Sequence, residues 1–112
     1  MPPRFLLGEF EQRVLLATLR CGDQPSAVEV RRELERALGR SVSRGAFYTT
    51  LERLEAKNRL TWRLQPRAAG GELPERVLKV TPQGLRDLRT ARRSLLAMWR
   101  GLEALVDSGG GK

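Results

Sequence analysis

The 112-residue sequence contains no histidine and a single cysteine, Cys21. The usual zinc-binding sets and every mechanism that uses histidine as acid, base or nucleophile are therefore excluded, and an internal disulfide is impossible. We interpret Cys21 as a small core residue at a helix end, with a nucleophile or redox sensor as the alternative. The carboxylates are dispersed along predicted helix faces, so we expect neither enzyme activity nor a cofactor or metal.

Long apolar runs are also missing. None approaches the roughly 20 residues needed to cross a bilayer, and the first residues lack the profile of a signal peptide, so we expect a cytoplasmic protein. A chain of this length with 40% apolar residues suits one compact domain. Acidic residues are in deficit, since 21 Lys and Arg oppose 13 Asp and Glu and give a net charge of +8. Such a surface should attract a polyanion, with nucleic acid as the first candidate and an anionic membrane surface as the second.

The hydrophobic pattern predicts three short helices followed by two strands. The helices are expected at residues 9–20, 27–38 and 44–57, and the strands at residues 60–65 and 76–80. Segment 66–74 is rich in Pro and Gly, which indicates an extended hairpin tip. Three closely connected helices followed by a hairpin are typical of a winged helix-turn-helix.

Several residues mark where these helices begin and end. Ser26 is followed three residues later by Glu29, which is the signature of a capping box, and Gly39 is expected to end the same helix. Ser43 is the expected N-cap of the third helix. Asn58 tolerates the left-handed conformation that ends a helix, so the third helix should stop at about residue 57.

Positive charge gathers on the third helix and the strand after it. Between residues 39 and 67 seven cations oppose only Glu52 and Glu55, a local excess of five positive charges. These cations are Arg40, Arg44, Arg53, Lys57, Arg59, Arg63 and Arg67. A solvated charge run is the plain interpretation, but the cluster coincides with the outer side of the third helix. We therefore interpret it as a surface that contacts DNA.

The third helix also offers groups that read bases. Arg44 can contact a guanine edge or a phosphate, Gly45 lets the backbone approach closely, and Thr49 offers a hydroxyl or methyl group to a base edge. For Tyr48 we leave two interpretations open, a phosphate contact and a half-buried ring packed on the wing. The other predicted DNA-binding residues, mostly phosphate contacts that set register without reading sequence, are Ser41, Ser43, Arg53, Arg63 and Arg67.

Thr81 and Pro82 are favoured N-cap and first-turn residues, and they predict a long last helix that runs to about Val106. An apolar stripe follows it at a three-four spacing, with one interruption at Arg92. A body of three short helices cannot cover such a stripe, so we expect part of it to form a homodimer interface. The predicted interface residues are Leu88, Leu95, Met98, Trp99 and Leu102.

The two tryptophans carry a further hypothesis. An indole near a two-fold seam can stack on a flat apolar molecule, so Trp99 is a candidate contact for a small hydrophobic effector. Simple interface packing is the alternative for Trp99, and packing in the core or at the wing base is the alternative for Trp62. The sequence does not name an effector.

Four short sequence motifs support the same arrangement. They are Leu7-Gly8-Glu9-Phe10, Gly45-Ala46-Phe47-Tyr48-Thr49-Thr50-Leu51-Glu52-Arg53-Leu54, Gly70-Gly71 and Val80-Thr81-Pro82-Gln83-Gly84. Through them nearly the whole chain resembles the PadR family of bacterial winged-helix transcriptional regulators. The resemblance implies a dimer that binds operator DNA, usually as a repressor, and dimerises through its C-terminal helix.

The chain departs from that family in two places. Many relatives have an aromatic-Gly pair where this chain has Ser26-Ala27, and a basic, Tyr-rich second wing strand where this one reads Glu72-Leu-Pro-Glu-Arg-Val-Leu78. Glu72 and Glu75 oppose the positive charges of the wing, which weakens the expectation that its tip grips phosphates.

We therefore predict a mainly α fold with a small antiparallel β-hairpin, a winged helix-turn-helix with a long C-terminal dimerisation helix. The expected parts are a DNA-binding domain at 1–81, the dimerisation helix at 82–107 and a disordered tail at 108–112. The predicted function is sequence-specific binding to double-stranded DNA as a homodimeric regulator on an inverted-repeat operator. The resemblance implies that this regulator is a repressor. The alternative is a winged-helix dimer that binds a protein or RNA partner.

Overall fold

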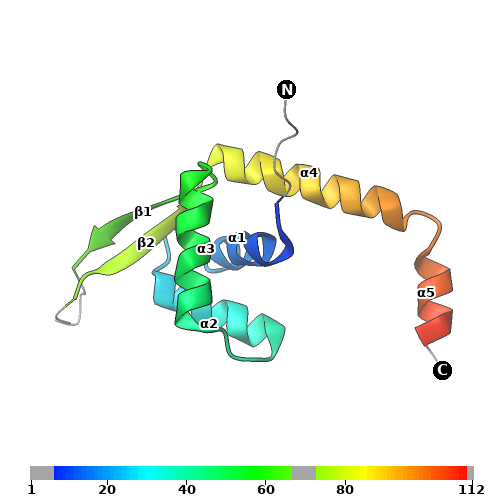
Figure 1. Cartoon of the computed structure of the whole chain (residues 1–112), viewed down its shortest axis with the longest axis horizontal. Coiled ribbons are helices and arrows are strands. Elements are labelled where there is room, and N and C mark those ends of the chain that lie inside the picture. The colour runs from blue at the N-terminus through cyan, green and yellow to red at the C-terminus, as the bar shows by residue number, and fades with distance from the viewer. Residues whose placement is uncertain (1–6, 67–72, 111–112) are drawn as a thin grey trace.

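The computed structural model describes residues 7–66 and 73–110. It shows a helical body with a hairpin projecting from one end and a helical arm from the other (Figure 1). The elements are α1 (Glu9–Arg20), α2 (Ala27–Leu38), α3 (Arg44–Ala56), β1 (Leu60–Gln65), β2 (Glu75–Val80), α4 (Pro82–Trp99) and α5 (Glu103–Gly110). This architecture confirms the predicted fold class.

The predicted caps form. Ser26 Oγ accepts from Glu29 N at 3.1 Å, and Glu29 Oε1 accepts from Ser26 N at 2.9 Å, which completes the capping box. Gly39 ends α2 with a φ of 71°. Ser43 Oγ accepts from Ala46 N at 3.1 Å and so begins α3. Asn58 follows α3 in the left-handed region, with a φ of 61°.

The hairpin pairs β1 with β2 in antiparallel register, from Leu60 opposite Val80 to Gln65 opposite Glu75. On the other edge of β2, Leu78 N donates to Pro25 O at 2.8 Å, so the start of α2 adds a short third edge to the sheet. The wing is therefore attached to both α2 and α3. Most of the predicted tip, residues 67–72, lies outside the described residues.

One apolar core joins the helical body to the base of the wing. The fully buried side chains include Leu15 of α1, Leu34 of α2, Phe47 and Leu51 of α3, and Leu78 of β2. Truncating a buried side chain of this size typically costs about 2–5 kcal/mol. Helix α3 is thus held from behind by the core, and its opposite face is left exposed.

Arg59 corrects the charge count made from the sequence. Its side chain is only 3% exposed, and it joins Glu11 of α1 to Asp87 of α4 through ion pairs of 3.4 and 2.6 Å. A charge that is paired in the interior adds nothing to the surface that meets a partner. The sequence alone did not indicate this, because the two partners lie 48 and 28 residues away.

The junction between β2 and α4 is closely packed. Thr81 Oγ1 accepts from Gly84 N at 2.9 Å and donates to Asn58 O at 2.6 Å, which confirms Thr81 as the N-cap of α4. A Cβ atom at Gly84 would overlap the carbonyl oxygen of Arg59 and lie 2.9 Å from Val80 Cγ1. Only glycine allows α4 to approach the body this closely.

The prediction of one helix from Pro82 to about Val106 is wrong. Helix α4 ends at Trp99, and Gly101 adopts a φ of 86°, which a right-handed helix cannot continue through. Helix α5 then begins at Glu103, and it includes residues 108–110, which were expected in the tail. Every residue from 92 to 109 is exposed, so the second half of α4 together with α5 forms an arm that the helical body does not cover. No helix of the described residues is long and apolar enough to span a bilayer.

Candidate nucleic-acid interface

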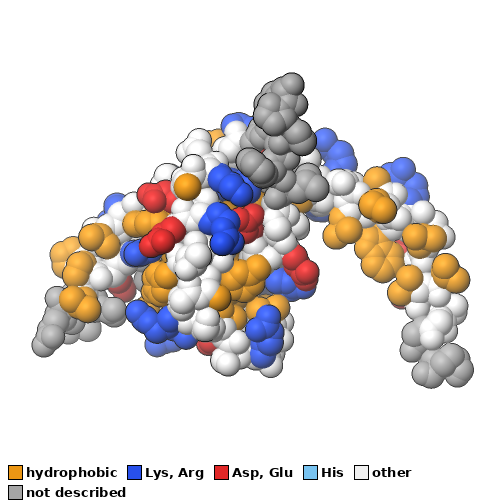
Figure 2. Space-filling view, in the orientation of Figure 1, with side chains coloured by type: hydrophobic (Ala, Val, Ile, Leu, Met, Phe, Trp, Pro, Cys, Tyr) orange, Lys and Arg blue, Asp and Glu red, His pale blue; other side chains and the backbone are white. Residues whose placement is uncertain are grey.

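The outer face of α3 is the centre of the candidate site. Phe47, Leu51 and Leu54 point into the core, whereas the predicted contact residues Gly45, Thr49, Arg44 and Arg53 are all exposed. Lys and Arg side chains lie on either side of α3 in the space-filling view (Figure 2). The structure therefore brings the predicted base-reading residues together on one accessible helix face.

Gly45 lies in the first turn of α3, and neither the packing nor the backbone conformation of the chain requires glycine there. A Cβ atom there would meet nothing within 4 Å, and Gly45 does not have a positive φ. Glycine inside a helix costs roughly 0.5–1 kcal/mol relative to alanine. The missing side chain leaves space on the outside of the helix, as close approach of an external surface requires.

The turn between α2 and α3 is braced from α2. Glu35 Oε2 accepts from Val42 N at 2.8 Å, and Arg31 Nε donates to Val42 O at 3.0 Å. Ser41 is exposed beside this turn, while the hydroxyl of Ser43 is used to cap α3. The turn is thus fixed in position, and the side chains of Ser41 and Ser43 are both exposed on it.

Tyr48 is half-buried between α3 and the wing. Its ring makes an edge-to-face contact with Phe47, with centroids 5.2 Å apart. The guanidinium groups of Arg44 and Arg76 lie 5.3 and 5.0 Å from the centre of the same ring. These contacts favour the interpretation of Tyr48 as a packing residue on the wing. Arg76 is a residue of this site that the sequence did not single out, because nothing in a six-residue strand indicates which side chain will meet α3.

The wing carries the predicted phosphate contact Arg63. This side chain is exposed and donates to Gln65 Oε1 at 2.8 Å and to Gln24 Oε1 at 3.0 Å. Alternation along β1 places Arg63 on the opposite face from Trp62. The structure therefore does not group Arg63 with Arg44. The remaining predicted wing residues, Arg67 and Glu72, lie outside the described residues.

The surface charge of the site is weaker than the sequence suggested, because Arg59 is internal. The described cations that remain between residues 39 and 66 are Arg40, Arg44, Arg53, Lys57 and Arg63. They still outnumber Glu52 and Glu55, so the surface keeps its positive sign and can attract phosphates.

The arm presents an apolar surface. Side chains at the predicted interface are 56% exposed at Leu95, 75% at Met98, 39% at Trp99 and 46% at Leu102. Leu88 differs, since it packs partly against the core of its own chain. An apolar run of this size on an extended arm is typical of a surface that another chain covers.

A separate groove of about 420 Å³ lies between α1 and α2. Its lining includes Leu16, Leu34 and Leu38 together with Arg13 and Arg20. No tryptophan lines this groove, so the predicted effector contact at Trp99 belongs to a different part of the molecule. The described residues contain no group of three or more Cys, Asp or Glu placed to hold a metal ion.

Solved structures with the same geometry are transcriptional regulators by their descriptions. A PadR-like regulator from Bacillus cereus is 19% identical, with 88% of each chain covered and a TM-score of 0.65. A PadR-like transcription factor from Bacteroides fragilis is 24% identical, with 88% of this chain and 87% of that chain covered and a TM-score of 0.61. RosR of H. salinarum is 17% identical, with 94% of each chain covered and a TM-score of 0.68.

At these identities the likeness shows a shared fold, the PadR-like winged helix. The resemblance seen in the sequence is thereby confirmed at the level of the fold. A scan against models of protein families found no match, and a search of curated proteins found none either. Because a fold hosts many functions, function has to be argued from the site.

Proposed function

We propose that this chain is a DNA-binding transcriptional regulator of the PadR type. The observation that carries the proposal is the exposed face of α3, where Gly45 leaves an opening that the chain's own packing does not need. An α-helix fits the major groove of B-DNA, and its first residues are the ones that reach base edges in helix-turn-helix proteins. The relatives in fold are themselves described as transcriptional regulators.

In this proposal Arg44 and Thr49 read bases, and Gly45 lets the helix backbone lie close to them. Ser41, Arg53 and Arg63 contact phosphates on either side and set the register of the helix. Ser43 acts mainly by capping α3, and its neighbouring backbone N–H groups face the same anionic surface. Tyr48 supports Arg44 from beneath.

The arm makes the regulator a homodimer in this proposal. Pairing through Leu95, Met98, Trp99 and Leu102 removes apolar surface from water, which stabilises association by roughly 25 cal/mol for each Å² that is buried. A two-fold dimer presents two α3 helices to the same side of a duplex, so the operator is an inverted repeat. Repression, rather than activation, is what the resemblance to the PadR family supports.

A small hydrophobic effector is the remaining part of the proposal. Trp99 is exposed on the arm, so in a dimer it would stand at or near the seam, where a flat apolar molecule can stack on it. Binding at the seam would change the distance between the two reading helices.

The alternative proposal is a winged-helix dimer whose basic face binds a protein or RNA. The observation that favours it is the modest charge of the wing, where the half-buried Glu75 stands opposite Gln65. Salt dependence and site preference separate the two. An operator binder prefers its site over random duplex by at least about 10³-fold, and its affinity falls steeply with salt.

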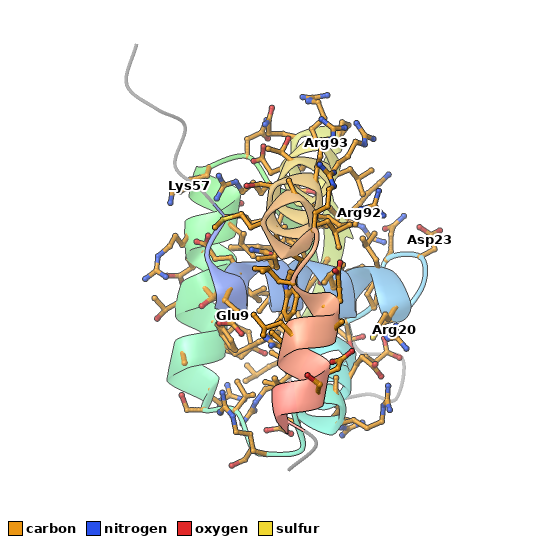
Figure 3. All side chains as sticks on the ribbon, turned by 90° about the vertical axis from the view of Figure 1, so that its right-hand side faces the viewer. Glu9, Arg20, Asp23, Lys57, Arg92 and Arg93 are labelled. Atoms are coloured by element: carbon orange, nitrogen blue, oxygen red, sulfur yellow. The ribbon has the colours of Figure 1, made fainter. Side chains whose placement is uncertain are left out.

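The test is a gel-shift titration of Arg44→Ala on the preferred duplex. We expect a loss of about 1–3 kcal/mol there and relaxed discrimination at one base pair. Arg63→Ala should instead weaken all duplexes by similar factors, as loss of a phosphate contact does. Arg93→Ala, on the outer side of the arm (Figure 3), is the matched control and should change neither. Affinity of Arg44→Ala within about twofold of the parent, a change below 0.5 kcal/mol, would show that α3 is not the reader.

A further inference from the structure

Arg76 occupies an unusual place between the wing and the reading helix. It lies on β2 opposite Leu64, next to the pair formed by Trp62 and Leu78. Its guanidinium carbon is 4.6 Å from the centre of the Trp62 ring and 5.0 Å from the centre of the Tyr48 ring. One cation on the second wing strand therefore contacts an aromatic ring on the first strand and another on α3.

The contacts of Arg76 are with rings rather than with anions. Its Nη1 atom is buried and makes no hydrogen bond with any described residue. No carboxylate in the described part of the chain forms an ion pair with it. Leaving a buried charged donor unsatisfied is costly, whereas each guanidinium–ring contact returns only about 0.5–2 kcal/mol. What the two ring contacts do fix is the position of the second wing strand relative to β1 and α3.

The same contacts lead to the residue proposed to read bases. Arg44 lies 5.3 Å from the centre of the Tyr48 ring, so Tyr48 is shared between Arg44 and Arg76. Phe47, which is fully buried, packs against the Tyr48 ring with the two ring planes nearly perpendicular, and so holds that ring from the core side. Movement of the wing would therefore move Arg76, then Tyr48, and with it the surface on which Arg44 rests.

We propose that Arg76 is a positioning residue for DNA recognition, which sets the angle of the wing against α3 and the direction of Arg44. This inference rests on the proposed function, because it assigns to Arg76 a role in the DNA specificity of the same site. Arginine suits this role because its planar guanidinium stacks on two ring faces at once, whereas the compact ammonium of lysine does not. Arg76 need not contact DNA to act in this way.

The decisive variant is Arg76→Lys, because it keeps the charge of the wing and removes the stacking. We expect affinity for the preferred duplex to fall by about tenfold or more, which corresponds to 1.4 kcal/mol. Affinity for random duplex should stay within about twofold, because the non-specific term depends on charge. Arg93→Lys makes the same exchange on the exposed arm and should leave both affinities unchanged. An unchanged ratio of specific to random affinity in Arg76→Lys would overturn the proposal.

A second variant and a second measurement guard against a simple loss of folding. Trp62→Leu keeps Arg76 but removes one of its rings, and it should lower the same affinity ratio in the same direction. Amide hydrogen exchange reports the wing directly: in Arg76→Lys the amides of β1 and β2 should exchange faster, while those of α1 and α2 stay protected. Unchanged exchange in the hairpin contradicts the proposal, whatever the DNA result.

These measurements distinguish a failure of the proposed function from a failure of the positioning role of Arg76. If the parent protein prefers no duplex, the proposed function fails. Faster exchange of the hairpin in Arg76→Lys would then still show that Arg76 sets the wing angle, and its recognition role would fall with the function. If the parent prefers an operator and Arg76→Lys binds it equally well, only the positioning role is lost.

Discussion

Arg59 donates from Nε to Oδ2 of Asp87 at 2.6 Å and is only 3% exposed, whereas many of the other described arginines lie on the surface. The same guanidinium reaches Glu11 Oε1 at 3.4 Å, and Glu11 Oε1 also accepts from Gly8 N at 3.0 Å. Through these contacts the start of α1, the residue before β1 and the first turns of α4 share one buried charged cluster. The direction in which the arm leaves the body is therefore set by electrostatics as well as by apolar packing.

The first prediction concerns this cluster. Arg59→Leu removes the guanidinium that Glu11 and Asp87 share and leaves their negative charges in the interior. We expect the free energy of unfolding to fall by about 3–5 kcal/mol, the usual cost of breaking a buried ion pair from one side. Urea denaturation measures this, and Arg93→Leu on the exposed arm is the control, expected to change stability by no more than about 0.5 kcal/mol. A loss in Arg59→Leu as small as in the control would show that the cluster is not a stabilising contact.

Gly84→Ala is the second prediction. Alanine is the better helix former by about 1 kcal/mol, so an open site would become more stable. At Gly84 the new methyl group would overlap the backbone of Arg59, and moving α4 away would also strain the cluster around Asp87. We expect a net loss of about 1–3 kcal/mol, as for other overpacked sites. Thermal unfolding measures it, and an unchanged or higher Tm would mean that α4 is packed less closely than the structure shows.

Gly45→Ala is the converse experiment on α3. No atom of the chain opposes the added methyl group, so stability should rise by about 0.5–1 kcal/mol. Affinity for the preferred duplex should nevertheless fall by about tenfold, because the methyl group would occupy the space that the groove surface needs. A substitution that raises stability but lowers DNA affinity would show that the partner, and not the fold, requires glycine at this position. A stabilised variant that binds DNA as well as the parent would contradict that interpretation.

Most features that depend on residues close together in the sequence were predicted correctly, whereas contacts between distant residues were not. Local signals were sufficient for the helix ends: the capping box of Ser26 and Glu29, the Ser43 cap and the left-handed Asn58 all formed as predicted. Each depends on groups only a few residues apart. The exposed face of α3 also followed from periodicity alone.

Long-range pairings were missed for the same reason. Arg59 looked like one more surface cation, because its partners on α1 and α4 are distant in sequence. From the sequence, Arg76 was only one of several charged residues of both signs in the wing, although in the structure it contacts Tyr48 of α3. The break at Gly101 had a local signal, a glycine within a helical pattern, but the apolar stripe continues on either side of it and therefore predicted one unbroken helix.

The fourth prediction concerns the arm. Leu95→Glu combined with Leu102→Glu places like charges against each other in the proposed apolar seam, so the dimer should separate into folded monomers. Because the monomer would hold only one half-site, specific affinity should fall by about 10²-fold or more. Sedimentation equilibrium at micromolar concentration measures the assembly. A double variant that stays dimeric would place the seam elsewhere, with α1 as the first candidate because Leu16 and Leu19 are 48% and 44% exposed.

The most direct test of the central claim is selection of bound fragments from genomic DNA by the purified protein, followed by footprinting of the enriched site. The account predicts one preferred inverted repeat with half-site centres about 10 base pairs apart, or a small multiple of one helical turn. It also predicts that Arg44→Ala fails to enrich that site. Recovery of fragments with no common motif, by a protein that is folded and dimeric, would contradict the claim that this winged helix reads an operator.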